Sequence, residues 1–149
     1  MLAKKILVLE DNLKVVAKII ELLDKLESEK DYIFEVVVLS SSKLAKDFLL
    51  KNKNNNFSKI NFDVVILDRD CNLYGSFHEL LDKKLFDNNR VISISTVDEY
   101  NNQARKKGVK KIVKKDLKDL DKFAEKLTKE IEKILTPSWL KRFSLPFKT

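Results

Sequence analysis

The feature that most constrains the fold is a short apolar run that ends in a carboxylate. Residues 64–67 read Val-Val-Ile-Leu, and Asp68 follows them directly. A short apolar run bounded by polar residues is typical of a strand buried on both faces, and such strands belong to parallel α/β sheets. In these sheets ligands bind beyond the carboxyl ends of the strands. We therefore expect Asp68 at the functional edge of the sheet.

A second apolar run ends in the same way. Residues 5–9 read Lys-Ile-Leu-Val-Leu and are followed by Glu10 and Asp11. Three carboxylates that converge at one edge repel each other unless a cation neutralises them, and hard divalent ions such as Mg²⁺ take carboxylate oxygens. Glu10, Asp11 and Asp68 are therefore candidate metal ligands. Taken singly, each acid has an alternative role as a loop or helix-capping carboxylate, and for Asp11 this alternative is strong.

The rest of the chain alternates between strand and helix patterns. Further strands are predicted over 33–39, 91–94 and 111–113, and helices over 13–28, 42–50, 77–85, 98–107 and 117–135. Leu44, Ala45, Phe48 and Leu49 are expected to share the buried face of the second helix. Residues 51–58 are expected to form a loop, and Gly108 to end the fourth helix at its C′ position. Five strands alternating with five helices predict one α/β domain, a doubly wound parallel sheet with helices on both faces.

The scarcity of certain residue types excludes several functions. With only two glycines, Gly75 and Gly108, the chain has no glycine-rich dinucleotide-binding turn or Walker-type phosphate loop. One histidine and one cysteine cannot form a zinc site of the usual spacing. The lone Cys71 cannot form an internal disulfide, and no apolar run reaches the roughly 20 residues that span a bilayer, so we expect a cytoplasmic protein. His78 is expected to be at the surface or half-buried rather than catalytic.

The net charge of +7 is distributed unevenly. Residues 105–149 contain 15 Lys or Arg and 6 Asp or Glu, whereas residues 1–104 contain 15 and 17. A basic surface can bind nucleic acid or an acidic partner. Here, however, the basic residues alternate with acids along a helix, which favours a solvated helix face. Direct nucleic-acid binding is therefore the less favoured function.

Two other predicted strands end in groups that complement the acids. Ser95 follows the strand over 91–94, and Lys114 and Lys115 follow the strand over 111–113. A hydroxyl can donate to a phosphoryl oxygen, and an ammonium can pair with Asp68 or with a phosphate on it. A carboxylate beside Mg²⁺ can itself attack a phosphoryl group. The ordered set therefore indicates phosphoryl chemistry at Asp68.

These motifs, in this order, resemble the receiver domain of two-component response regulators over residues 4–135. The matching segments are residues 5–12, with the acidic pair, residues 63–68, as the phosphoacceptor strand, Ile94-Ser95, and residues 108–117, a Gly to Lys-Asp run. The resemblance implies a flavodoxin-like fold with strand order 2-1-3-4-5. It also implies that Asp68 accepts phosphate, that Ser95 and Lys115 act at the phosphoryl group, and that Mg²⁺ binds Glu10, Asp11, Asp68 and the backbone carbonyl of Asp70.

The resemblance further implies a single-domain regulator. A histidine kinase or phosphotransfer protein would supply the phosphoryl group, and an output protein would read it. Enzymatic activity would extend at most to self-phosphorylation and autodephosphorylation. A homodimer would form through the helix over 98–107, the strand over 111–113 and the helix over 117–135. Residues 1–135 would form the receiver domain, and the aromatic-basic tail over 136–149 would dock on this domain or bind a partner.

Two departures from the family pattern motivate an alternative. The loop over 69–75 lacks the common proline, and Gly75 comes about one residue early. Ile112 stands where an aromatic residue is often found, three positions before the lysine. These differences allow a degenerate receiver that acts as a phosphorylation-independent binding or scaffold module.

Overall fold

The computed structural model describes residues 2–54, 61–69 and 75–137. Five strands form one sheet in the order β2-β1-β3-β4-β5, and every pairing is parallel. The elements are β1 (Leu2–Leu9), α1 (Leu13–Glu29), β2 (Tyr32–Leu39), α2 (Ser42–Asn54), β3 (Val64–Leu67), α3 (His78–Asp82), a 3₁₀ turn (Asn88–Arg90), β4 (Val91–Ser95), α4 (Asp98–Lys106), β5 (Lys111–Lys114) and α5 (Leu120–Leu135). The predicted fold class and strand order are therefore confirmed.

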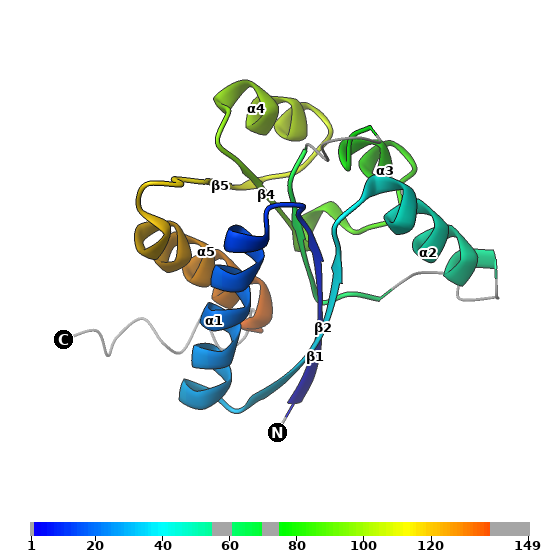
Figure 1. Cartoon of the computed structure of the whole chain (residues 1–149). Coiled ribbons are helices and arrows are strands. Elements are labelled where there is room, and N and C mark those ends of the chain that lie inside the picture. Colours follow the sequence, from blue (N-terminus) through cyan, green and yellow to red (C-terminus); the bar gives the residue numbers. More distant parts are fainter. Residues whose placement is uncertain (1, 55–60, 70–74, 138–149) are drawn as a thin grey trace.

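Two apolar cores flank the sheet. Helices α1 and α5 pack on one face, and α2, α3 and α4 lie toward the other (Figure 1). Strand β3 serves both cores, because Val64 and Ile66 face the first and Val65 and Leu67 face the second. Complete burial of such side chains contributes roughly 1.5–3 kcal/mol each. The apolar run that precedes Asp68 is thus the centre of the fold, and the position of Asp68 follows from it.

Local capping leaves the end of β1 available for function. The N-cap of α1 is Asn12, whose Oδ1 accepts hydrogen bonds from the backbone N–H groups of Lys14 at 3.0 Å and Val15 at 3.3 Å. Asp11 is therefore not the capping residue of this helix. At the end of α4, Gly108 has φ +101° and occupies the predicted C′ position.

Helix α2 differs from its prediction in length and in its buried face. It continues to Asn54, where a loop was expected from residue 51. Of the four apolar residues expected to face the core, Ala45 and Leu49 are buried, but Leu44 and Phe48 are 57% and 38% exposed. The helix lies beside the edge strand β2 and packs on the core through Ala45, Leu49 and the partly buried Leu50.

Helices α3 and α5 are shorter than predicted. Helix α3 spans only His78–Asp82, and Lys84, with φ +52°, turns the chain away from a helical path. The prediction that His78 is at the surface or half-buried is wrong, because His78 is buried, with 4% of its surface exposed. Helix α5 begins at Leu120, since Asp119 accepts from the N–H of Lys122 as its N-cap and leaves Leu117 exposed.

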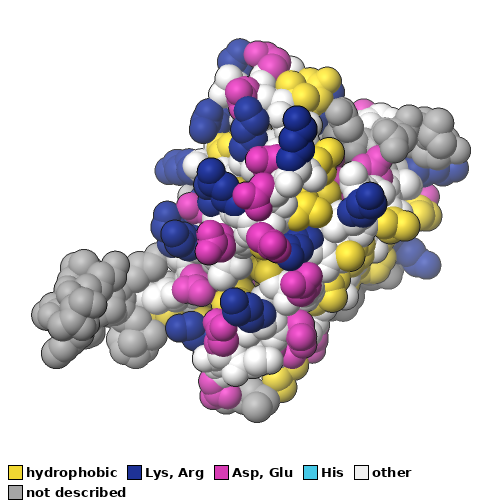
Figure 2. Space-filling view, turned by 60° about the vertical axis from the view of Figure 1, so that its left-hand side comes forward, with side chains coloured by type: hydrophobic (Ala, Val, Ile, Leu, Met, Phe, Trp, Pro, Cys, Tyr) yellow, Lys and Arg dark blue, Asp and Glu magenta, His cyan; other side chains and the backbone are white. Residues whose placement is uncertain are grey.

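The surface carries mixed charge. On the face in Figure 2, Lys and Arg side chains are interspersed with Asp and Glu side chains. Lys18 of α1, for example, pairs with Asp121 of α5 and lies 3.4 Å from Glu21. Among the described residues, no helix combines the length and the apolar character needed to cross a membrane.

Candidate functional site

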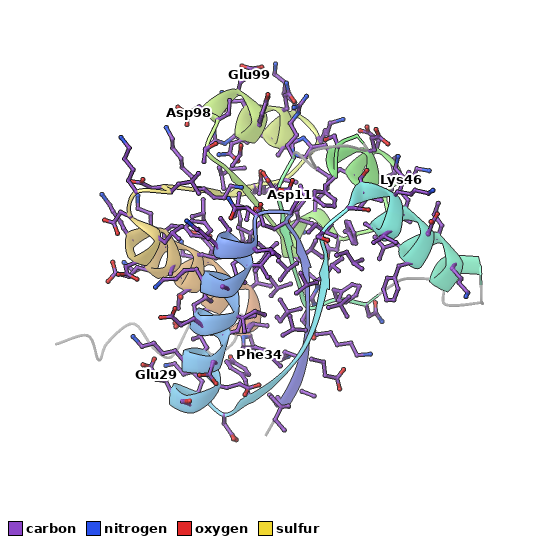
Figure 3. All side chains as sticks on the ribbon, in the orientation of Figure 1. Asp11, Glu29, Phe34, Lys46, Asp98 and Glu99 are labelled. Atoms are coloured by element: carbon purple, nitrogen blue, oxygen red, sulfur yellow. The ribbon has the colours of Figure 1, made fainter. Side chains whose placement is uncertain are left out.

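Strand pairing brings the three predicted carboxylates together. Leu9 of β1 lies opposite Leu67 of β3, and the N–H of Asp68 donates to the Leu9 carbonyl at 2.9 Å. Glu10 and Asp68 therefore leave neighbouring strands at the same level. Carboxylate oxygens of Glu10, Asp11 and Asp68 all lie within 4.8 Å of one another. Figure 3 places Asp11 at this edge, between the end of β1 and the start of α1.

Lys115 connects two of these acids. It is the first residue after β5, and its N–H donates to the carbonyl of Ser95 at 2.9 Å, which continues the β4–β5 pairing. Its Nζ atom donates to Glu10 Oε2 at 2.8 Å and to Asp68 Oδ2 at 3.0 Å. Lys114 points the other way, to Asp98 at 3.2 Å. The structure thus brings Lys115, and not Lys114, into the acidic cluster.

Burial dominates the electrostatics of the cluster. It raises the pKa of Glu10 to about 7, and the nearby charge of Asp68 adds to the increase. Burial also raises the pKa of Asp68, against the opposing effect of Lys115. For Lys115, burial by itself would lower the pKa, but the two carboxylates raise it overall. Glu10 and Asp68 share one ammonium, so this buried group has an excess of negative charge when all three are ionised.

This donor set suits a hard divalent cation. Carboxylate oxygens are the preferred protein ligands of such ions, and a cation would relieve the repulsion among Glu10, Asp11 and Asp68. Glu10 and Asp68 are buried, which strengthens their interaction with a bound charge. Asp70, the fourth predicted ligand, lies outside the described residues, as does Cys71.

Ser95 reaches the same edge at the end of β4. Its side chain is buried, and its Oγ accepts a hydrogen bond from the N–H of Val97 at 3.1 Å. Helix α4, which follows, has no side-chain cap from its own N-cap residue. The Ser95 hydroxyl therefore faces the turn that leads into α4 in this structure.

Three residues near the site were not indicated by the sequence: Asn101, Arg69 and Tyr100. Asn101 of α4 is buried, where its Oδ1 accepts from Ser93 Oγ at 2.9 Å and its Nδ2 donates to the Ser95 carbonyl at 3.4 Å. Arg69 places its guanidinium 3.9 Å from the ring centroid of Tyr100. Helical spacing gives a weak indication that Asn101 is buried, since it lies three positions before Ala104, the other buried residue of α4.

Comparison with solved structures finds the same fold in response regulators. The phosphorylated cyanobacterial phytochrome response regulator RcpA is similar with a TM-score of 0.67 and 22% identity, over 97% of this chain and 99% of that one. The bacteriophytochrome response regulator RtBRR has a TM-score of 0.65 and 19% identity, over 92% and 80%. The Mn²⁺-bound response regulator Rcp1 has a TM-score of 0.61 and 21% identity, over 96% and 99%.

No family model and no curated protein sequence matches this chain. The structural similarity therefore identifies the fold: a response-regulator receiver fold, as the sequence motifs implied. At this level of identity the likeness defines the architecture, and the function rests on the residues of the site.

Proposed function

We propose that this protein is a single-domain response-regulator receiver that accepts a phosphoryl group on Asp68, with Mg²⁺ bound, and signals by protein contact. The observation that carries the proposal is the contact of one buried lysine, Lys115, with both Glu10 and Asp68 inside a cluster of three carboxylates. This arrangement provides a nucleophile, a set of cation ligands and a fixed positive charge at one edge. It favours a phosphorylatable receiver over a degenerate scaffold.

Each residue has a distinct role in this proposal. An Asp68 carboxylate oxygen attacks the phosphorus of a phosphohistidine or an acyl phosphate, and the bond from phosphorus to the donor breaks, so that the donor leaves as imidazole or carboxylate. Lys115 pairs with the transferred phosphoryl oxygens. The Ser95 hydroxyl turns from the Val97 N–H to donate to one of them.

Glu10, Asp11 and Asp68 would hold Mg²⁺ together with the Asp70 carbonyl. When bound, the ion supplies positive charge to the incoming phosphoryl oxygens. Glu10 and Asp11 contribute acceptor oxygens to the ion, and Lys115 keeps Glu10 and Asp68 oriented. The chain's own contribution is therefore a pre-assembled, largely water-excluded edge.

The proposal extends to partners and organisation. Residues 1–135 form the receiver domain, and residues 136–149 are a tail outside it. The phosphodonor is a histidine kinase or phosphotransfer protein, and a phytochrome-type kinase is the first to test because solved structures of this fold are named as phytochrome response regulators. The protein acts in the cytoplasm and binds its output protein, or a second copy of itself, through α4, β5 and α5.

Phosphorylation can be tested directly by intact mass. Wild type, Asp68→Asn and Asp63→Asn are incubated with acetyl phosphate, with and without Mg²⁺. Asp63 lies just before β3, at the opposite end of the same strand, and is the matched control. We expect one Mg²⁺-dependent phosphoryl adduct on wild type and Asp63→Asn, and none on Asp68→Asn. An unmodified wild type, or an adduct that persists in Asp68→Asn, would refute the proposal.

A further inference from the structure

Arg69 directly follows the proposed phosphoacceptor, Asp68. Its guanidinium lies 3.9 Å from the ring centroid of Tyr100, a residue in the first turn of α4. Both side chains are partly buried. This distance is well within the range of a cation–π contact. Arg69 therefore connects the end of β3 with α4.

The backbone of Arg69 is firmly held. Its N–H donates to Asp68 Oδ1 at 2.8 Å, and its carbonyl accepts from the N–H of Phe77 at 2.9 Å and from Ser76 Oγ at 2.9 Å. These bonds hold Arg69 against Ser76 and Phe77, which follow the 69–75 loop. The Asp68 carboxylate is thus in direct contact with the backbone of Arg69, and the side chain of Arg69 contacts Tyr100.

Helix α4 is joined to the same edge by few polar contacts among the described residues. Ser95 accepts from Val97, and Asn101 contacts Ser93 and the Ser95 carbonyl. Position 112, where the family often has an aromatic residue, holds Ile112, which packs in the apolar core with α2, α3 and α4. Tyr100 is thus an aromatic ring of α4 that stands in direct contact with the residue next to Asp68.

We propose that Arg69 transmits the phosphorylation state of Asp68 to α4, stacking on Tyr100 before phosphorylation and pairing with the phosphoryl group afterwards. The inference rests on the proposed phosphorylation of Asp68. A phosphoryl group adds about −1.5 to −2 charge next to Arg69. Charge-assisted bidentate pairing of guanidinium with phosphate oxygens is stronger than a partly exposed cation–π contact, so the guanidinium leaves the ring.

Release of Tyr100 changes a surface that a partner can read. The first turn of α4 carries Asp98 and Glu99, which Figure 3 shows at the outer end of the molecule. Asp98 in turn lies 3.2 Å from Lys114 of β5. A shift of Tyr100 therefore alters the side-chain arrangement of α4 next to β5 without requiring an aromatic residue at position 112.

The ring of Tyr100 provides a direct readout. The chain has three tyrosines, Tyr32, Tyr74 and Tyr100, so ¹⁹F NMR of protein labelled with 3-fluorotyrosine gives three signals, and Tyr100→Phe assigns the relevant one. In wild type, acetyl phosphate with Mg²⁺ should shift the Tyr100 signal. In Arg69→Ala, that signal should differ from wild type before phosphorylation and should not move afterwards, while intact mass still shows the adduct.

Controls separate this inference from the proposed function. Arg105→Ala removes another α4-associated guanidinium, which bonds to Asn102 at 2.7 Å, and should retain the wild-type shift. An Arg69→Ala protein that takes up phosphate and shifts its Tyr100 signal as wild type does would overturn this inference alone. A wild type that takes up phosphate without any Tyr100 shift would do the same. A wild type that forms no adduct would overturn both.

A second variant tests the contact between Arg69 and Tyr100 by changing the residue on α4. Tyr100→Leu keeps an apolar side chain but removes the π face. Hydrogen exchange of the α4 amides should be about two- to fivefold faster than in wild type before phosphorylation, the factor expected for loss of one cation–π contact. Phosphorylation should then accelerate α4 exchange in wild type but not in Tyr100→Leu. An equal acceleration in both proteins would contradict the inference.

Discussion

Strand β3 has an acid at each end, Asp63 before it and Asp68 after it, and each acid pairs with a basic residue next to another strand. The two pairs differ in burial. At the amino edge, Asp63 precedes β3 and Arg90 precedes β4, with their side chains 3.8 Å apart and 30% and 46% exposed. At the carboxyl edge, Asp68 and Lys115 lie 3.0 Å apart and are 8% and 7% exposed. The residue types are alike, but only the second pair is removed from water.

This difference indicates which pair serves stability and which serves binding. An exposed ion pair contributes about 0–1 kcal/mol and needs no further explanation. A buried pair loses most of its Coulomb energy to desolvation, and a second carboxylate, Glu10, makes the balance worse. The carboxyl edge is therefore a costly arrangement for a fold to hold, and the proposed binding of a cation and a phosphoryl group would account for it.

The strongest test of this comparison removes the cation of each pair. Lys115→Met leaves Glu10 and Asp68 buried without their ammonium and should lower the free energy of unfolding by about 3 kcal/mol without Mg²⁺. Arg90→Met should cost at most about 1 kcal/mol. Urea unfolding at pH 7 measures both. Equal costs for the two variants would show that burial does not distinguish the edges.

A second test compares neighbouring asparagines of α4. Asn101→Ala removes the partner of the buried Ser93 hydroxyl and should cost about 2 kcal/mol. Asn102→Ala, on the exposed side, should cost less than about 0.5 kcal/mol. The double variant Ser93→Ala with Asn101→Leu should recover much of the loss, because both polar partners are then replaced by apolar groups. Equal destabilisation by the two single Ala variants would argue against a polar connection between β4 and α4.

The smallest effect is a dependence on pH confined to the carboxyl edge. The pKa of Glu10 is raised from 4.5 to about 7, so its protonated form stabilises the metal-free protein below pH 4.5, and this contribution is lost as the pH rises to about 7. Mg²⁺ requires the ionised form, so its affinity should rise up to about tenfold per pH unit below pH 7 and level off above it. Calorimetric titration between pH 6 and 8 checks this, and Glu10→Gln should flatten the profile. A wild-type affinity independent of pH would contradict the assignment.

Much of the site could be predicted because strand ends are readable in a sequence. Apolar runs followed by Asp68, Glu10 or Ser95 specify both the strand and the residue at its carboxyl edge. Parallel pairing of the strands then brings these residues to the same edge of the sheet. Asn101 escaped prediction because a buried polar side chain has no apolar periodicity, and its role depends on Ser93, a residue of another element. Arg69 and Tyr100 are distant in sequence, and their contact depends on how α4 sits above the sheet.

The errors in the helices have similar physical causes. Leu117 continues the apolar spacing of α5, yet the Asp119 cap starts the helix three residues later, and local hydrogen bonding overrides the pattern. His78 belongs to a helix of only five residues, too short for its buried side to be read from periodicity. The Asn- and Lys-rich residues after Leu50 suggested a loop, but α2 continues through 51–54.

The salt bridge between Lys115 and Glu10 joins residues 105 positions apart in the chain. Glu10 is synthesised before Lys115, which is added only after the residues of β1 to β5 have been made. The complete site cannot form in a partly folded chain that lacks β5, because Lys115 directly follows that strand. A ligand that contacts both Asp68 and Lys115 therefore needs the complete sheet, and it should slow unfolding more than it accelerates folding.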